Sequence, residues 1–347
     1  MIRLAALPLS CLLLLWPLWQ PGRITEGATR TVPAPVASGA LHAAVHYVSP
    51  AGSDSGDGSS THPWATIQHA DRLVQPGDTV VVLNGTYSGD ILLRSSGTDA
   101  SPITYVAREK WQAKLVGTTS GAGTAVIRLT GAHLIIKDFD ITGTDANGVI
   151  LAASGTSASF NQAIGNYVHD LTTPCDQNSG AGLHTGGGDN YWGISHDDFI
   201  GNVVVNIHQA PGCNTTPYSA GIYETVPYGV VANNIVISTG YAIECWHNAH
   251  HETISGNILV NNLRGITVGD GDAPGGISND YTVVKDNVIV GTGSWAIVES
   301  GKTGRHNTYT GNMLFNNASE IMLGRGLVAT GTIVSNREPQ PVIIHKP

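Results

Sequence analysis

From about residue 160 onward, short apolar stretches alternate with glycine, asparagine and other turn-forming residues at a regular interval. Six of these stretches directly follow an asparagine, and the asparagines are separated by 23 to 36 residues. They are Asn166, Asn202, Asn234, Asn257, Asn287 and Asn312. Intervals of this length are expected when a chain completes one coil of a solenoid and returns to the same register. The pattern therefore predicts a stack of coils.

Two further columns share this register. A ring stands six residues before each asparagine, at Phe160, His196, Tyr228, His251, Tyr281 and His306. A second strand in each coil begins with a small residue followed by an apolar one, at Gly182, Gly221, Ala242, Gly265 and Ala296. Short strands rich in Val and Ile, without a long helical pattern, are typical of an all-β, right-handed parallel β-helix. We expect the asparagines to bond from coil to coil at the bends.

The segment before these coils has a different pattern. Ile67, Ala70, Leu73 and Val74 recur at helical spacing, which predicts a short amphipathic helix. We expect this N-terminal helix to cap the open end of the first coil, because an exposed solenoid edge would pair with other chains.

The same segment carries a family resemblance, through the runs Tyr47-Val48-Ser49-Pro50, Pro63-Trp64-Ala65-Thr66, Pro76-Gly77-Asp78-Thr79 and Gly85-Thr86-Tyr87. It resembles the opening of secreted right-handed parallel β-helix proteins, including the family 9 pectate lyases. The resemblance implies the fold, export and a carbohydrate context. Those pectate lyases use a lysine base beside a calcium site made of aspartates in neighbouring coils. In this chain the corresponding coils carry His, Tyr and Glu, so the catalytic set does not match.

The chain's start predicts export. In residues 1–24, Arg3 precedes an apolar run, as in a signal peptide. The run contains Pro8 and Pro17 and is shorter than the roughly 20 residues that a membrane span needs. Residues 25–42 are rich in Pro, Ala, Gly and Thr and predict a linker, and residues 43–347 form the β-helix domain. We therefore expect a secreted or periplasmic monomer with no membrane span after signal removal.

The net charge indicates the class of binding partner, and the positions of the cysteines indicate one disulfide bond. A net charge of -9 with 12% charged residues excludes nucleic-acid binding through a general basic surface and favours a polysaccharide partner. Cys175 and Cys213 lie in corresponding loops of adjacent coils, so we expect a disulfide between them. Cys245 lies within a strand and is expected to be a small core residue.

The candidate chemistry lies on the second strands. The residue two after the small one is His184, Tyr223 and Glu244 in three successive coils, and these side chains are expected to form one outward stripe of acid and base groups. His247 is a further candidate, and Trp246 and Tyr218 are candidates for stacking on a sugar ring. A stripe of mixed residues also occurs on the outside of any solenoid.

Three less specific features accompany the stripe. Glu224 falls in the inward register, so it either turns outward or pairs with a basic group. Asp270 and Asp272 alternate with glycines, as in loops that hold Ca²⁺. Arg264 can neutralise a uronate or act as a lyase base, although a surface arginine beside a bend is common.

These features predict an enzyme that cleaves an acidic polysaccharide such as pectate by lyase chemistry, in which a base removes the proton alpha to a uronate carboxylate. One alternative is a glycoside hydrolase that uses Glu224 and Glu244, or one of them with an aspartate. A second is a noncatalytic glycan-binding or surface protein.

Overall fold

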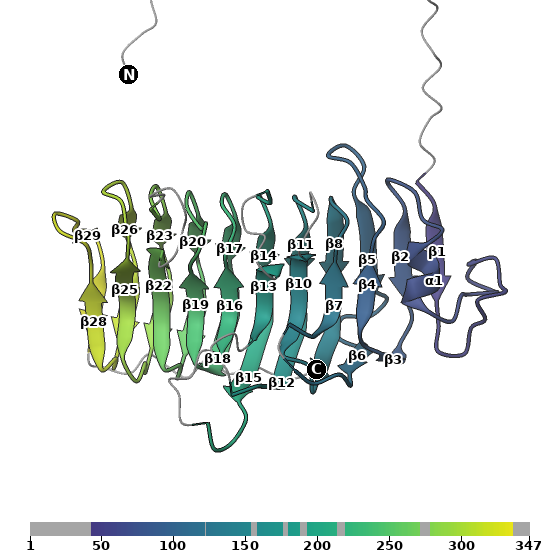
Figure 1. Ribbon diagram of the computed structural model, residues 1–347, viewed down its shortest axis with the longest axis horizontal. Coiled ribbons are helices and arrows are strands. Elements are labelled where there is room, and N and C mark those ends of the chain that lie inside the picture. Colours follow the sequence, from purple (N-terminus) through teal and green to yellow (C-terminus); the bar gives the residue numbers. More distant parts are fainter. Residues whose placement is uncertain are drawn as a thin grey trace, which may run out of the picture. The chain divides into compact units, whose positions relative to one another are not determined.

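The computed structural model describes residues 43–121, 123–153, 158–175, 180–187, 193–213, 219–270 and 278–335. These residues form a parallel β-helix in which three sheets run along the stack of coils (Figure 1). Each strand pairs in parallel with the equivalent strand of the coils before and after it. The predicted fold is therefore confirmed.

Sheet A contains β1 (Val45–Val48), β2 (Thr79–Val82), β5 (Ile103–Ala107), β8 (Leu134–Lys137), β11 (Gln162–Ile164), β14 (Asp198–Ile200), β17 (Val230–Ala232), β20 (Thr253–Ser255), β23 (Val283–Lys285), β26 (Thr308–Thr310) and β29 (Ala329–Thr330). Sheet B contains β3 (Gly85–Ser88), β6 (Ala113–Gly117), β9 (Asp140–Gly143), β12 (Tyr167–Thr173), β15 (Val203–Gln209), β18 (Ile235–Thr239), β21 (Ile258–Val260), β24 (Val288–Val290), β27 (Met313–Phe315) and β30 (Ile333–Ser335). Sheet C contains β4 (Ile91–Leu93), β7 (Ala125–Leu129), β10 (Asn147–Ala153), β13 (Ala181–Gly187), β16 (Ala220–Glu224), β19 (Tyr241–Cys245), β22 (Arg264–Asp270), β25 (Trp295–Gly301) and β28 (Ser319–Met322).

One apolar core runs through the middle of the coils. In a single coil, Ile254 of sheet A, Leu259 of sheet B and Ile266 of sheet C all point inward and are completely buried. Residues between them in sequence alternate outward, because successive side chains of a strand lie on opposite faces. Each coil therefore adds its own layer of core.

The asparagine column forms the predicted ladder. All six asparagines are completely buried. The side-chain amide of Asn202 donates to Oδ1 of Asn234 at 3.0 Å, and that of Asn234 donates to Oδ1 of Asn257 at 3.0 Å. The backbone N–H of each donates to the same oxygen at 2.9 Å. These bonds pair the polar groups that the bend would otherwise bury unpaired.

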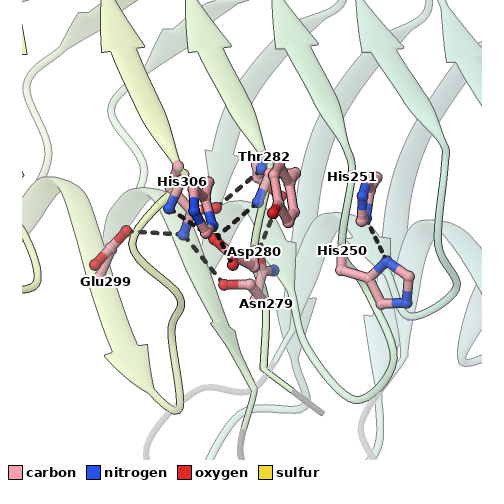
Figure 2. Close-up of polar contacts among 9 residues, drawn as sticks. His250, His251, Asn279, Asp280, Thr282, Glu299 and His306 are labelled. Carbon is pink, nitrogen blue, oxygen red and sulfur yellow. Dashed lines mark hydrogen bonds and ion pairs between the residues drawn. The ribbon is translucent and has the colours of Figure 1, made fainter.

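The ring column also exists and stacks along the outside of a corner. Successive rings lie 4.3 to 4.9 Å apart between centroids, and His133 extends the column by one coil on Phe160. Figure 2 shows the polar contacts at its end, where Nδ1 of His306 lies 2.7 Å from Oδ2 of Asp280. Because the ring faces cover one another, this column is structural and offers edges, not faces, to a sugar.

One short helix, α1 (Ile67–Asp71), lies at the N-terminal end of the stack, where helical spacing predicted it (Figure 1). The Thr66 side chain accepts a hydrogen bond from the N–H of His69 and caps the helix. Ile67 and Ala70 are buried, whereas Leu73, also assigned to its apolar face, is 48% exposed.

The predicted disulfide joins Cys175, which follows β12, to Cys213, which follows β15, with their Cα atoms 5.2 Å apart. It therefore ties two adjacent coils together just after their sheet B strands. Cys245 is a free, completely buried thiol in the core, as its position in a strand predicted.

Candidate functional site

The outer face of sheet C carries one residue per coil in a continuous row, which we call the outer stripe. The strand register places its members next to one another in the order Leu92, Arg128, Ile150, His184, Tyr223, Glu244, Thr267 and Val298. The predicted juxtaposition of His184, Tyr223 and Glu244 is therefore present, because all three coils keep the same alternation between inward and outward residues.

The rings of His184 and Tyr223 stack with their centroids 4.9 Å apart, and the ring of His247 lies 6.0 Å from that of Tyr223. Neither ring nitrogen of His184 has a hydrogen-bond partner among the described residues. Burial, and secondarily the proximity of His247, lowers the pKa of His184 to about 3. His184 is thus a neutral imidazole over the physiological pH range, and both of its ring nitrogens are buried.

Glu244 is the carboxyl group of the outer stripe. Burial raises its pKa to about 7, and the positive charge of Arg264 opposes that rise. The Arg264 guanidinium lies over the ring of Tyr241 at 4.8 Å from its centroid, which fixes the arginine on the next coil beside Glu244. A carboxyl group that titrates near neutral pH can act as either base or acid.

Trp246 lies directly after β19 and packs against the ends of the following strands. A side chain at Gly269 would place its Cβ 2.6 Å from the indole, so only glycine permits this approach. One side of the indole therefore rests on backbone. Tyr218, the other predicted stacking residue, lies outside the described residues.

The expectation for Glu224 is wrong in both of its forms. Its side chain is completely buried inside the stack, and its Oε2 accepts a hydrogen bond from the Thr185 hydroxyl at 2.9 Å, not from a basic group. Burial raises the pKa of Glu224 well above its usual range. A glycan on the outer face of sheet C does not meet this carboxyl group.

Glu224 fills a gap in an inner polar column that the sequence reasoning missed. The residue after each ring forms this column, at Asn161, Asp197, Gly229, Glu252, Thr282 and Asn307. Gly229 has no side chain, and a Cβ built there would lie 2.7 Å from Oε2 of Glu252 and 3.3 Å from Oε2 of Glu224. Burial raises the pKa of Glu252 well above its usual range, and Glu224 adds to the rise. A polar residue after five of the six rings is the signal that could have revealed this column.

The predicted cation loop is only partly described. Asp270 ends β22 and is completely buried, and Asp272 lies outside the described residues. Among the residues that the structure describes, no three His, Cys, Asp or Glu side chains are grouped as a metal site would need. Calcium binding therefore stays a prediction.

Comparison with known proteins supports the fold and the resemblance. Residues 46–203 match the family model described as "Pel9A-like, right handed beta helix region". The solved structure "Crystal structure of pectate lyase Pel9A" superposes with a TM-score of 0.63 at 18% identity, covering 86% of this chain and 78% of that chain. "A new PL6 alginate lyase complex with trisaccharide" superposes with a TM-score of 0.51 at 15% identity, covering 83% and 60%. At these identities the structures share the fold alone.

A curated relative, "Uncharacterized protein YwoF" of Bacillus subtilis (strain 168), is 30% identical over 146 residues, which are 39% of this chain. The match spans 31% of that relative's length. The chain is thus a right-handed parallel β-helix that resembles the family 9 pectate lyases. In the described part of the chain, no helix has the length and apolar character that crossing a membrane would require.

Proposed function

We propose that this right-handed parallel β-helix, which resembles the family 9 pectate lyases, cleaves an acidic polysaccharide by β-elimination on the outer stripe of sheet C. The observation that carries the proposal is the position of Glu244. Its carboxyl group has a pKa of about 7, lies beside the Arg264 cation and shares one row with Tyr223 and with the imidazole of His184 that stacks on it. These are the groups that proton abstraction beside a sugar carboxylate requires.

In the proposed reaction, the Glu244 carboxylate removes the proton from the carbon next to the uronate carboxylate. A carbon–carbon double bond forms, and the bond between the sugar carbon and the glycosidic oxygen breaks. The Tyr223 hydroxyl, next to Glu244 in the register, donates a proton to the departing oxygen. Arg264 balances the negative charge that develops on the uronate. The neutral ring of His184 stacks on the ring of Tyr223 and holds it in place.

The alternative reaction is glycoside hydrolysis, because a carboxyl group with a pKa near 7 is also suited to protonate a glycosidic oxygen. Hydrolysis usually needs a second carboxylate across the bond. Within the described residues of the outer stripe, Glu244 is the only carboxyl group, and Glu224 points into the core. This arrangement favours elimination.

The proposal includes an extracellular or periplasmic location, which the disulfide between Cys175 and Cys213 supports because such bonds persist in oxidising compartments. The test is incubation of the purified protein with pectate, alginate and neutral glycans, each with added calcium and with chelator. Elimination gives unsaturated uronate ends that absorb ultraviolet light, whereas hydrolysis gives new reducing ends without that absorbance. Binding without either product would leave a noncatalytic glycan-binding role.

A further inference from the structure

A cavity of about 270 Å³ opens near the N-terminal end of the outer stripe. Its lining includes Asp90, Leu92, Thr119, Thr124, Ala125 and Arg128. The volume is slightly below the usual range for ligand pockets, which suits a single sugar unit better than a longer segment. The lining thus offers one cation, one anion, two hydroxyl groups and apolar carbon atoms. These are the kinds of group that can bind the charged group, the hydroxyls and the C–H faces of an acidic sugar.

The cavity lies in line with the candidate catalytic residues. Leu92 and Arg128 are themselves members of the outer stripe, and Ile150 connects Arg128 to His184 in the register. At a spacing of about 4.8 Å per coil, Arg128 lies about 10 Å from His184 and about 19 Å from Glu244 along the stripe. Figure 1 shows the strands β4, β7, β10, β13, β16 and β19 following one another in this direction. One polysaccharide chain lying along sheet C can therefore occupy both places.

The stretch of the stripe between the two places is covered. Ile150, which lies between Arg128 and His184 in the register, has 3% of its surface exposed. A polysaccharide that occupies both places therefore does not contact Ile150.

The charges in the cavity specify how such a sugar would be oriented. Arg128 donates from Nη2 to the Gly123 carbonyl, which holds the guanidinium in place and uses one of its five N–H donors. Asp90 is exposed on the lining, and its Oδ2 accepts a hydrogen bond from Thr118. Burial and Asp90 together raise the pKa of the neighbouring Asp145 to about 7. A sugar carboxylate would be repelled by Asp90 and attracted by Arg128, whereas sugar hydroxyls can donate to Asp90.

We infer that this cavity is a distal subsite that binds the carboxylate of a uronate unit through Arg128, several sugar units away from the bond cleaved at Glu244. The inference rests on the proposed function and adds to it a binding residue, Arg128, which lies four coil spacings from Glu244. Arginine suits this role because its planar guanidinium binds a carboxylate through two parallel hydrogen bonds.

The experiment measures calorimetric binding of octagalacturonate and octamannuronate, and of the fully methyl-esterified octagalacturonate, which lacks the charges. The variants are Arg128→Gln, Arg128→Lys and, as a matched control, Arg108→Gln, whose exposed side chain follows β5 in sheet A. We expect Arg128→Gln to weaken binding of the preferred acidic octamer about tenfold or more, Arg128→Lys to weaken it less, and Arg108→Gln to leave it unchanged. The esterified octamer should bind weakly to all forms.

Equal affinity of Arg128→Gln and the unchanged protein for the acidic octamers would overturn the subsite, and so would failure of the unchanged protein to bind either one. An equal loss for the esterified octamer would also overturn it, because the contact would not be to the carboxylate. The two proposals fail separately. If binding depends on Arg128 but no unsaturated product forms, elimination is refuted and the subsite is kept. If an unsaturated product forms but Arg128→Gln binds as well as the unchanged protein, the subsite is refuted and elimination is kept.

Discussion

Replacement of Glu244 by Gln tests the outer stripe through both stability and chemistry. The variant keeps the shape of the side chain but removes its proton and charge. In the folded protein the pKa of Glu244 is about 7, against 4.5 for an unperturbed glutamate, because burial disfavours the charged form. The stabilising contribution of the protonated group is therefore complete below about pH 4.5 and is lost as the pH rises through about 7.

The size of this effect follows from the pKa difference. One pKa unit corresponds to about 1.4 kcal/mol, so a difference of two and a half units gives at most about 3.5 kcal/mol. Glu244→Gln does not titrate, so its free energy of unfolding should gain up to about 3.5 kcal/mol on the unchanged protein between about pH 4 and about pH 8. Urea unfolding of both proteins across this range measures the difference, with Glu109→Gln as a control at an exposed position.

The same variant should lose activity by a factor of about a hundred or more, because a positioned acid or base contributes at least that much. For elimination, kcat/KM of the unchanged protein should rise with pH through about 7, where Glu244 becomes a carboxylate. A stability difference that is independent of pH would contradict the burial of this carboxyl group. Retained activity in both Glu244→Gln and His184→Ala would place the chemistry elsewhere, with Arg264 and the Asp270 coil next to be tested.

Other predictions concern the bonds that hold the coils together. Asn234→Leu removes a side-chain amide that makes four hydrogen bonds, so it should lower the free energy of unfolding by about 3 kcal/mol or more. The control Asn84→Leu, at an exposed position, should cost little. An unchanged urea midpoint for Asn234→Leu would count against the ladder. Serine at both Cys175 and Cys213 opens a link across 38 residues and should cost up to about 4 kcal/mol, measured by the same unfolding assay; two free thiols in unreduced peptides would reject the bridge. Glu252→Gln should stabilise the protein at alkaline pH and progressively less in acid, since burial raises the pKa of Glu252 and the ionised form is the costly one; a difference that does not vary with pH would refute this.

Features that every coil must share could be predicted from the sequence. The asparagine column repeats because each bend has the same backbone groups to satisfy, and the ring column repeats because each ring needs a neighbour to stack on. The row from His184 through Tyr223 to Glu244 follows from the same register, since alternation fixes which side chains point outward. His133 was missed because its coil has Phe139 where later coils have an asparagine.

Features that depend on one coil alone could not be predicted this way. Glu224 is tolerated in the core because Gly229, which has no side chain, leaves room for the Glu224 carboxyl group in the inner polar column. A single glycine gives no periodic signal in the sequence. The pKa of Glu244 depends on how deeply the surrounding side chains bury it and on Arg264 stacking over Tyr241, which are contacts between coils. The cavity at Arg128 likewise forms between strands β4 and β7 that are far apart in the chain.

The distribution of strand lengths explains why the candidate site lies on sheet C and not on sheet A. In sheet A the strands β11, β14, β17, β20, β23 and β26 each have 3 residues, so each presents few outward positions between bends. In sheet C the strands β10, β13, β22 and β25 have 7 residues and β16 and β19 have 5. Longer strands give a wider flat face, on which a row of side chains can contact successive units of a polymer. The short strands of sheet A thus serve the stack of coils, whereas the longer strands of sheet C provide the surface on which acid, base and cation are brought into one row.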